Sequence, residues 1–275
     1  MQNTRAGSLR IHTEARSGWG RWKLVWCTIG VCLGLAPWLS RVIRAELSID
    51  AKPLSEWLQD LNAFDSDEKN AAEAAVRKGG PNAIPALLRR LNARDTHLRR
   101  LRRILNEWLI PRLGNRELMK SDETLRSEAV LAFRVLGSSA SASLPLLFRL
   151  LTNAPADTGA PVAIAQSMAG IGAGSIGYLR AGLDNPQPWI RRASLLALMD
   201  LEMAAADALP DAARRTKDPD TEVRGLALVF ISEVSKDKNE KRRLFEAAVS
   251  DSDPQIRFYV QKELRELAEH DTPVP

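Results

Sequence analysis

The sequence predicts an all-α protein: an α-solenoid of stacked antiparallel helix pairs that follows an N-terminal hydrophobic segment. The block DPDTEVR at residues 218–224 is typical of a turn that opens a helix, and an apolar run follows it. Related blocks begin at Asn185 and Asp253, so that Arg191, Arg224 and Arg257 recur every 33 residues. A fixed period of this length is the signature of a stacked repeat array.

Residues 1–45 form a basic leader around an apolar segment, residues 24–40, that contains no charged side chain. A basic stretch before such a run predicts a signal peptide or a signal anchor, and it places the leader's N-terminal side in the cytoplasm. The segment is short for a spanning helix, which needs about 20 residues. The alternative is a buried helix of a cytosolic protein, which Gly30, Gly34 and Pro37 disfavour. We therefore expect the body to be extracytoplasmic (periplasmic), either anchored to the inner membrane or secreted, with a cytoplasmic location as the alternative.

The net charge of +5 belongs to this leader. Residues 1–45 hold seven Lys or Arg and one acid, so 32 basic and 33 acidic residues remain for the rest of the chain. The body is therefore close to neutral, which weakens any argument for nucleic-acid binding from the overall charge. Both cysteines, Cys27 and Cys32, lie in the leader, so the body has no disulfide and no Cys-ligated metal site.

Residues 46–270 are predicted to be the solenoid, and residues 271–275 a polar tail. Its helices are expected where apolar residues recur at helical spacing between Gly, Pro and Asp turn signals. In order, they are a capping helix at 54–64, then pairs at 67–78 and 83–91, 125–136 and 143–151, 161–172 and 175–183, helices from Pro186 and Pro219 paired with 205–216 and 239–249, and a last helix at 255–269.

An inserted basic helix, about residues 92–121, separates the first two pairs. Apolar residues such as Leu98, Leu101 and Trp108 occupy one side of this helix. Its other side is a basic face predicted to bind a partner, made of Arg99, Arg100, Arg102 and Arg103. Such a face could also be merely solvated, with Arg stems that cover apolar surface. The functional alternatives are an acidic protein, an anionic membrane surface or nucleic acid.

The repeated blocks resemble the HEAT repeat family, in the short form seen in phycobilisome-lyase-type repeats. The resemblance rests on Pro186/Ile190/Arg191, Pro219/Val223/Arg224 and Pro254/Ile256/Arg257, and it covers about residues 66–269. It implies that Asp and Arg side chains bridge neighbouring repeats in a structural ladder, here Arg191, Asp218, Arg224, Asp251 and Arg257. In the third pair Ala163 occupies the Arg position, so packing alone is expected there.

No sequence feature indicates catalysis, a cofactor, a metal site or a small-molecule substrate. The three histidines are far apart, and there is no P-loop, HExxH or GxSxG motif. The segment GIGAG at 170–174 lies between two predicted helices rather than after a strand, so it lacks the context of a dinucleotide loop. The sequence therefore predicts a non-catalytic protein-binding scaffold. The alternative is a cytosolic nucleic-acid-binding or DNA-glycosylase-like HEAT protein that uses the basic surface of residues 77–116.

Overall fold

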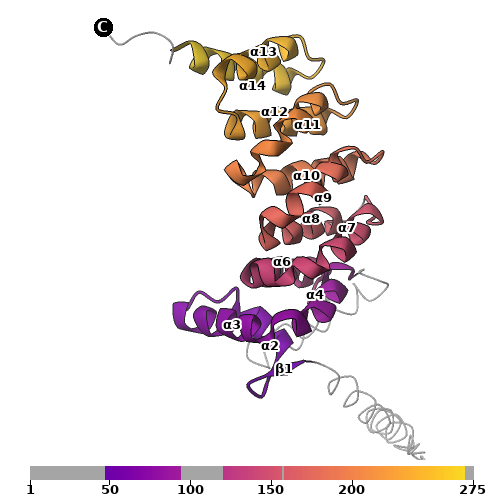
Figure 1. Cartoon of the computed structure of the whole chain (residues 1–275), viewed down its shortest axis with the longest axis vertical. Coiled ribbons are helices and arrows are strands. Elements are labelled where there is room, and N and C mark those ends of the chain that lie inside the picture. The colour runs from indigo at the N-terminus through magenta and orange to yellow at the C-terminus, as the bar shows by residue number, and fades with distance from the viewer. Residues whose placement is uncertain (1–46, 94–119, 157, 270–275) are drawn as a thin grey trace, which may run out of the picture. The chain divides into compact units, whose positions relative to one another are not determined.

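The computed structural model describes residues 47–93, 120–156 and 158–269, which are mostly helical (Figure 1). The predicted all-α class is therefore confirmed. The α-helices are α2 (Leu54–Asp60), α3 (Ser66–Gly79), α4 (Ile84–Leu91), α6 (Asp122–Leu136), α7 (Leu144–Thr152), α8 (Ala160–Ile171), α9 (Ile176–Leu183), α10 (Pro188–Met199), α11 (Leu209–Arg215), α12 (Thr221–Val234), α13 (Lys238–Ala248) and α14 (Pro254–Glu269). The strands β1 (Ser48–Ile49) and β2 (Lys52–Pro53) form a small antiparallel hairpin.

Short polar side chains begin several of the helices. Asp65, Ser121, Asp220 and Asp237 each accept a hydrogen bond from a backbone N–H in the first turn of α3, α6, α12 and α13. These bonds satisfy N–H groups that have no partner inside a helix. At α12 the capping residue is Asp220, whose Oδ1 accepts from the backbone N–H of Val223 at 3.0 Å.

Three of the helix pairs turn at a glycine with a positive φ. Gly80, Gly137 and Gly172 follow α3, α6 and α8, with φ values of 49°, 51° and 106°. Glycine adopts this conformation without the steric penalty that a side chain would bring. In these three pairs a 3-10 helix leads into the second helix: η1 (Gly80–Ala83), η3 (Gly137–Ser143) and η4 (Ala173–Ser175). A fourth 3-10 helix, η5 (Glu202–Ala208), connects α10 to α11.

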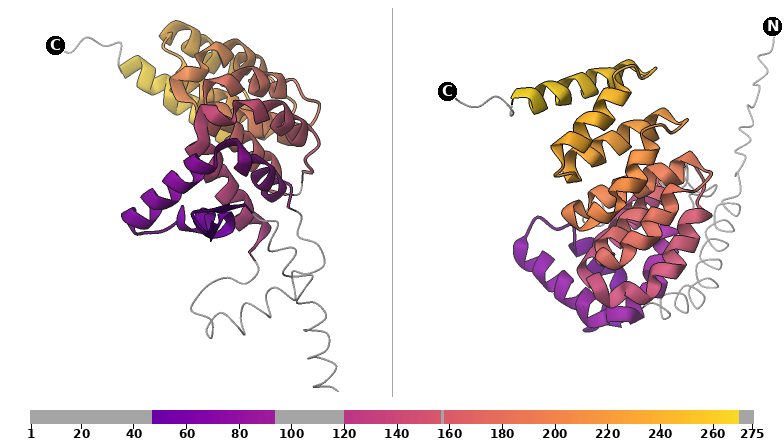
Figure 2. Two further views of the ribbon diagram at one scale, coloured as in Figure 1. Left: turned by 60° about the horizontal axis from the view of Figure 1, so that its bottom comes forward. Right: turned by 45° about the horizontal axis from the view of Figure 1, so that its top comes forward.

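The helices pack in the order of the sequence. The first helices of successive pairs contact one another, α6 on α8, α8 on α10 and α10 on α12. Each second helix also contacts the first helix of the following pair, namely α4 on α6, α7 on α8, α9 on α10 and α11 on α12. Figure 1 shows the layers following one another along the chain from α3 to α14, and the right view of Figure 2 shows the same order toward the C-terminal end.

Leucine and phenylalanine side chains fill the space between these layers. Phe133, Phe230 and Phe245 are fully buried, as are Leu87 and Leu147. Each of these side chains contributes about 1.5–3 kcal/mol by leaving water. Since each helix pair buries its apolar side only against its neighbours, the stability of one pair depends on the next.

Two glycines allow helices to approach closely. A Cβ atom on Gly170 of α8 would lie 3.0 Å from the backbone nitrogen of Arg134 on α6. A Cβ atom on Gly182 of α9 would lie 2.2 Å from Oγ of Ser194 on α10. The close approaches therefore join different pairs.

The N-terminal end of the described unit differs from the sequence prediction. The capping helix ends at Asp60 rather than at Phe64, because residues 61–65 form a turn that ends in the cap of α3. Phe64 is exposed as a result. The hairpin before α2 was not expected; Trp57 Nε1 donates a hydrogen bond to the carbonyl of Ile49 and fixes it to α2.

Within the described ranges, residues 122–152 are long and apolar enough to cross a membrane by length and composition alone. They are nevertheless two helices, α6 and α7, separated by η3. Their side chains Arg126 and Glu128 are buried, as are Phe133 and Leu147. This pattern is that of core helices packed against neighbours. The predicted leader, residues 1–45, lies outside the described residues.

Candidate functional site

The predicted ladder residues lie at the turns between successive pairs. Arg191 Nη2 donates to Asp218 Oδ1 at 2.6 Å, and both side chains are buried. Arg224 makes a two-pronged contact with Asp251, Nε to Oδ2 at 2.8 Å and Nη2 to Oδ1 at 2.9 Å. Each arginine thus reaches the aspartate 27 residues further along the chain, in the next turn.

The same arginines also hold the turn that precedes their own helix. Arg191 Nη1 donates to the carbonyls of Asn185 and Pro186, and Arg224 Nη1 to those of Asp218 and Pro219. Arg257 Nη1 likewise donates to the carbonyls of Asp251 and Ser252 at 2.7 and 2.9 Å. Within the described ranges, no carboxylate lies within ion-pair distance of Arg257.

These contacts shift the pKa values of the aspartates. Burial by itself would raise the pKa of Asp218, but hydrogen bonds from Arg191 and from the backbone of Asp220 hold it below its ordinary value. The hydrogen bond from Arg224, opposed by burial, lowers the pKa of Asp251. The same bond raises the pKa of the Arg224 guanidinium. The ladder therefore stays charged at neutral pH, where it holds turns together and has no proton to exchange.

The neighbouring pairs use different contacts at this position. Arg126 of α6 donates from Nη2 to the carbonyl of Ala93 at 2.5 Å, which ties the segment after α4 to α6. In the third pair, where Ala163 is buried, Ser167 Oγ donates to the Ala163 carbonyl. Trp189 Nε1 of α10 donates to the carbonyl of Ala154 at 3.1 Å, so a hydrogen bond supplements the packing that was expected there.

A buried carboxylate at Glu128 is a feature that the sequence analysis missed. Its side chain is 1% exposed; Arg90 Nη1 donates to Oε2, and Lys120 Nζ donates to Oε1 at 2.5 Å. Lys120 also donates to the carbonyl of Ser55 at 3.4 Å. A signal was present in the sequence, since Glu128 stands directly before Ala129 and one helical turn before Ala132, and both alanines are buried. This carboxylate joins α4 and α6 on the two sides of the inserted segment.

The predicted basic face, Arg99, Arg100, Arg102 and Arg103, belongs to residues 94–119, which lie outside the described residues. The proposed partner contact at this face therefore stays a prediction. All three histidines are outside the described residues as well. Within the described ranges, no group of three or more His, Cys, Asp or Glu side chains is placed to hold a metal ion.

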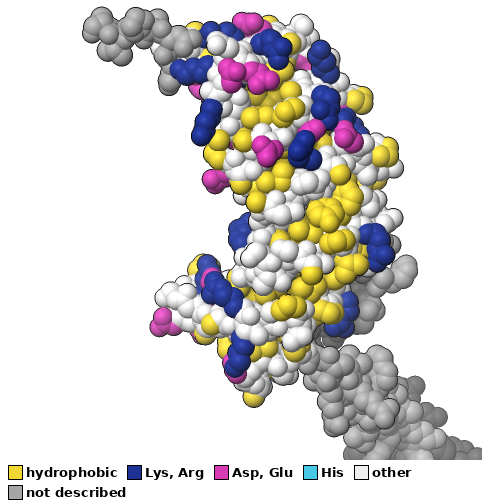
Figure 3. Space-filling model, in the orientation of Figure 1, with side chains coloured by type: hydrophobic (Ala, Val, Ile, Leu, Met, Phe, Trp, Pro, Cys, Tyr) yellow, Lys and Arg dark blue, Asp and Glu magenta, His cyan; other side chains and the backbone are white. Residues whose placement is uncertain are grey.

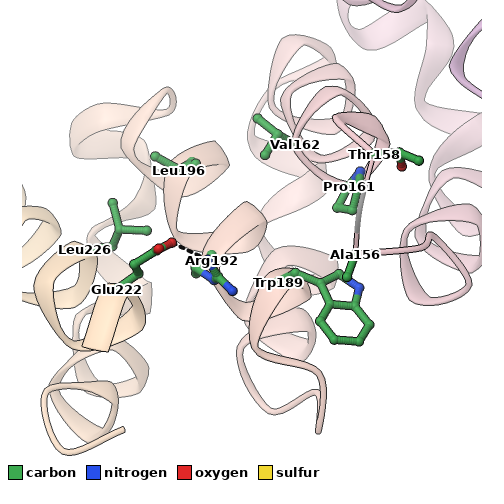
Figure 4. Close-up of a pocket in the computed structure, with 9 residues that line it drawn as sticks. All are labelled: Ala156, Thr158, Pro161, Val162, Trp189, Arg192, Leu196, Glu222 and Leu226. Atoms are coloured by element: carbon green, nitrogen blue, oxygen red, sulfur yellow. Dashed lines mark hydrogen bonds and ion pairs between the residues drawn. The ribbon is translucent and has the colours of Figure 1, made fainter. Parts of the chain in front are cut away.

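An open pocket of about 550 Å³ crosses three successive first helices (Figure 4). Its walls come from α8, α10 and α12 and from the segment before α8, and its lining residues are Ala156, Thr158, Pro161, Val162, Trp189, Arg192, Leu196, Glu222 and Leu226. The lining is mostly apolar, which is typical of a site that binds an apolar group. The sequence analysis did not find this pocket, because its residues are brought together only by the stacking of three pairs.

One ion pair stands at the edge of the pocket. Arg192 of α10 pairs with Glu222 of α12, and its Nε lies 3.7 Å from Asp220 Oδ1. The Glu222 side chain is 70% exposed, so solvent screens the ion pair, which contributes little to the stability of the fold. The Nε of Arg192 is buried without a hydrogen-bond partner.

No family model and no curated protein matches the chain. Among solved structures, the chain is similar to an engineered protein at 14% sequence identity and a TM-score of 0.37, over 78% of this chain and 96% of the engineered one. A likeness this distant carries no argument about function.

Proposed function

We propose that this chain is a HEAT-type α-solenoid that acts as a non-catalytic protein-binding scaffold, exported or anchored to the inner membrane. The order of packing, with each second helix against the next first helix, supports the solenoid. The 27-residue Arg-to-Asp contacts at Arg191 and Arg224 support the resemblance to HEAT arrays, in which such side chains bridge repeats. Stacked arrays of this kind bind partners along surfaces built from several repeats.

The observation that carries the binding function is the pocket over α8, α10 and α12. It is apolar, open to solvent and built from three consecutive pairs, so an elongated partner could follow it from one pair to the next. Aromatic side chains such as Trp189 are frequent centres of protein interfaces. The ion pair of Arg192 with Glu222 at its edge suits a polar rim around an apolar contact.

A photo-crosslinking residue placed at Leu226, on the edge of the pocket, tests this function in cells. We expect the full chain to form a covalent adduct with a protein, which mass spectrometry of the adduct identifies. The matched control places the same residue at the exposed Lys217, away from the pocket, and should give no such adduct. A second substitution, Leu196→Asp in the pocket wall, should abolish the adduct. If Leu226 gives no protein adduct, or gives the one that Lys217 gives, this function is wrong.

The proposed location has a separate test. A phosphatase that is active only outside the cytoplasm, fused after residue 60, should be active, because residues 24–40 would deliver it across the inner membrane. A fusion that lacks residues 1–45 is the control and should be inactive. An inactive full-length fusion that accumulates as soluble protein would contradict the export proposal and favour the cytosolic alternative.

A further inference from the structure

The pocket over α8, α10 and α12 has the dimensions of one α-helix lying across these three helices. Along α10 its lining residues run from Trp189 to Leu196, seven positions apart, which is about 10 Å of helix. Packed helix axes lie about 8–10 Å apart, so a pocket that touches three neighbouring helices extends over about 16–20 Å. A helix with its side chains is about 10–12 Å wide, and about 12 of its residues span 18 Å.

The walls of the pocket also favour a helix over an extended peptide. An extended peptide binds by adding a strand to the open edge of a sheet. Among the described residues the strands are β1 and β2, and both precede α2. The walls of the pocket are three helices and the segment before α8, so no strand edge is present there. An extended peptide would leave backbone N–H and C=O groups without partners, whereas a helix satisfies its own.

Each of the three helices contributes one half-buried apolar side chain to the pocket. These are Val162 of α8, Leu196 of α10 and Leu226 of α12, which Figure 4 shows on their separate helices. Residues i and i+7 lie on one side of a helix about 10 Å apart, close to the spacing of packed helices. A bound helix with apolar residues at i, i+4 and i+7 would therefore contact all three walls.

The charge around the pocket becomes negative toward α12. Residues 158–199 hold three arginines and one aspartate, and α8 itself carries no charged residue. Residues 200–234 hold eight acidic and four basic residues. At the edge of the pocket, the single guanidinium of Arg192 serves two carboxylates, Asp220 and Glu222. In the view of Figure 3, acidic side chains likewise gather toward the α10 to α14 end. The α12 side of the pocket is thus complementary to a cation.

We propose that this pocket binds an amphipathic α-helix of a protein partner, apolar on one side and with Lys or Arg at the end that lies over α12. Its apolar side chains would cover Val162, Leu196 and Leu226. Its cation would pair with Glu222, whose side chain is 70% exposed. An acidic helix would meet uncompensated like charge at α12. This inference rests on the proposed binding function and specifies the chemistry of the partner at that same pocket.

A displayed library of random peptides about 15 residues long, selected on the full-length chain in a mild detergent, tests this proposal. We expect selected peptides to carry apolar residues at helical spacing and Lys or Arg toward one end. A proline in the middle of such a peptide should abolish binding, because it breaks the helix. Glu222→Lys and Leu196→Asp should each weaken binding at least tenfold, and added salt should weaken it as well.

The matched controls lie outside the pocket. Glu123→Lys reverses the charge of an exposed glutamate on α6, and Met203→Asp replaces an exposed apolar residue of η5. Both should leave the affinity unchanged. Circular dichroism of each variant shows whether it remains folded, which is expected of Glu222→Lys because that side chain is exposed.

The proposal is wrong if no peptide is selected, if the peptides are acidic or bind without forming a helix, or if Glu222→Lys leaves their affinity unchanged. It is also wrong if phosphatidylglycerol vesicles or a second copy of the chain bind there instead, as shown by vesicle binding or a dimer that Leu196→Asp abolishes. The crosslink at Leu226 separates the two proposals. An adduct whose crosslinked segment is neither helical nor basic leaves the proposed function standing and overturns this inference.

Discussion

Glu128→Ala should destabilise the protein by about 3–5 kcal/mol, the loss expected when one partner of a buried ion pair is removed. The Glu128 side chain is 1% exposed, and its two cationic partners, Arg90 and Lys120, are 13% and 15% exposed. If the carboxylate is removed, both positive charges lose this partner in a region of low dielectric. Urea denaturation followed by circular dichroism, with the free energy of unfolding extrapolated to water, measures the loss.

Glu123 of the same helix provides the control, because it is exposed on the first turn of α6. Glu123→Ala should change the free energy of unfolding by less than about 0.5 kcal/mol, which is usual for a surface substitution. Glu128→Gln keeps the shape and removes the charge, so its effect should fall between the two. Equal stability of the Glu128→Ala and Glu123→Ala chains would show that the buried carboxylate does not join α4 to α6.

Asp218→Ala should cost a similar amount, about 3–5 kcal/mol at neutral pH, because it leaves the buried Arg191 without its carboxylate. The Asp218 side chain is fully buried, and its Oδ1 also accepts from the backbone N–H of Asp220 at 3.0 Å. The substitution therefore removes the link between two turns and a hydrogen bond within one of them. Asp207→Ala, at an exposed aspartate of η5, is the control and should have little effect.

The contribution of Asp218 should depend on pH in one direction. Its pKa in the folded state lies below the ordinary value, which is ~3.9 in an unfolded chain. Its stabilisation is therefore fully present above about pH 4 and is lost as the pH falls through the folded pKa. The difference in unfolding free energy between the parent and Asp218→Ala should be constant from pH 5 to 8 and should shrink below pH 4. A difference that persists unchanged at pH 2 would rule out the ion pair as its cause.

The sequence predicted the helices well, because the signals are local. Glycines such as Gly137 end first helices, and prolines such as Pro145 and Pro161 stand in the first turn of the next helix. The 27-residue contacts from Arg191 and Arg224 follow a period that is visible in the chain. Helix ends were predicted less well: the end of α2 was wrong by four residues, because residues 61–65 form a turn that leads into the cap of α3 at Asp65.

The surfaces could not be predicted, because they depend on which residues the stacking brings together. Nothing in the sequence places Val162, Trp189 and Leu226 around one pocket, although they are 27 to 64 residues apart. The partners of Glu128 lie 38 and 8 residues away, on the two sides of the insertion.

Each second helix packs on the first helix of the following pair, so the contact between them joins two successive sequence repeats. Adding or removing one whole 33-residue period therefore forms the same contact between a second helix and the next first helix again. Such a chain can change in length during evolution without any new interface having to arise. The long segment between α4 and α6 interrupts the period where the ion pairs of Glu128 already join these two helices. Residues inserted there leave α4 and α6 packed against each other.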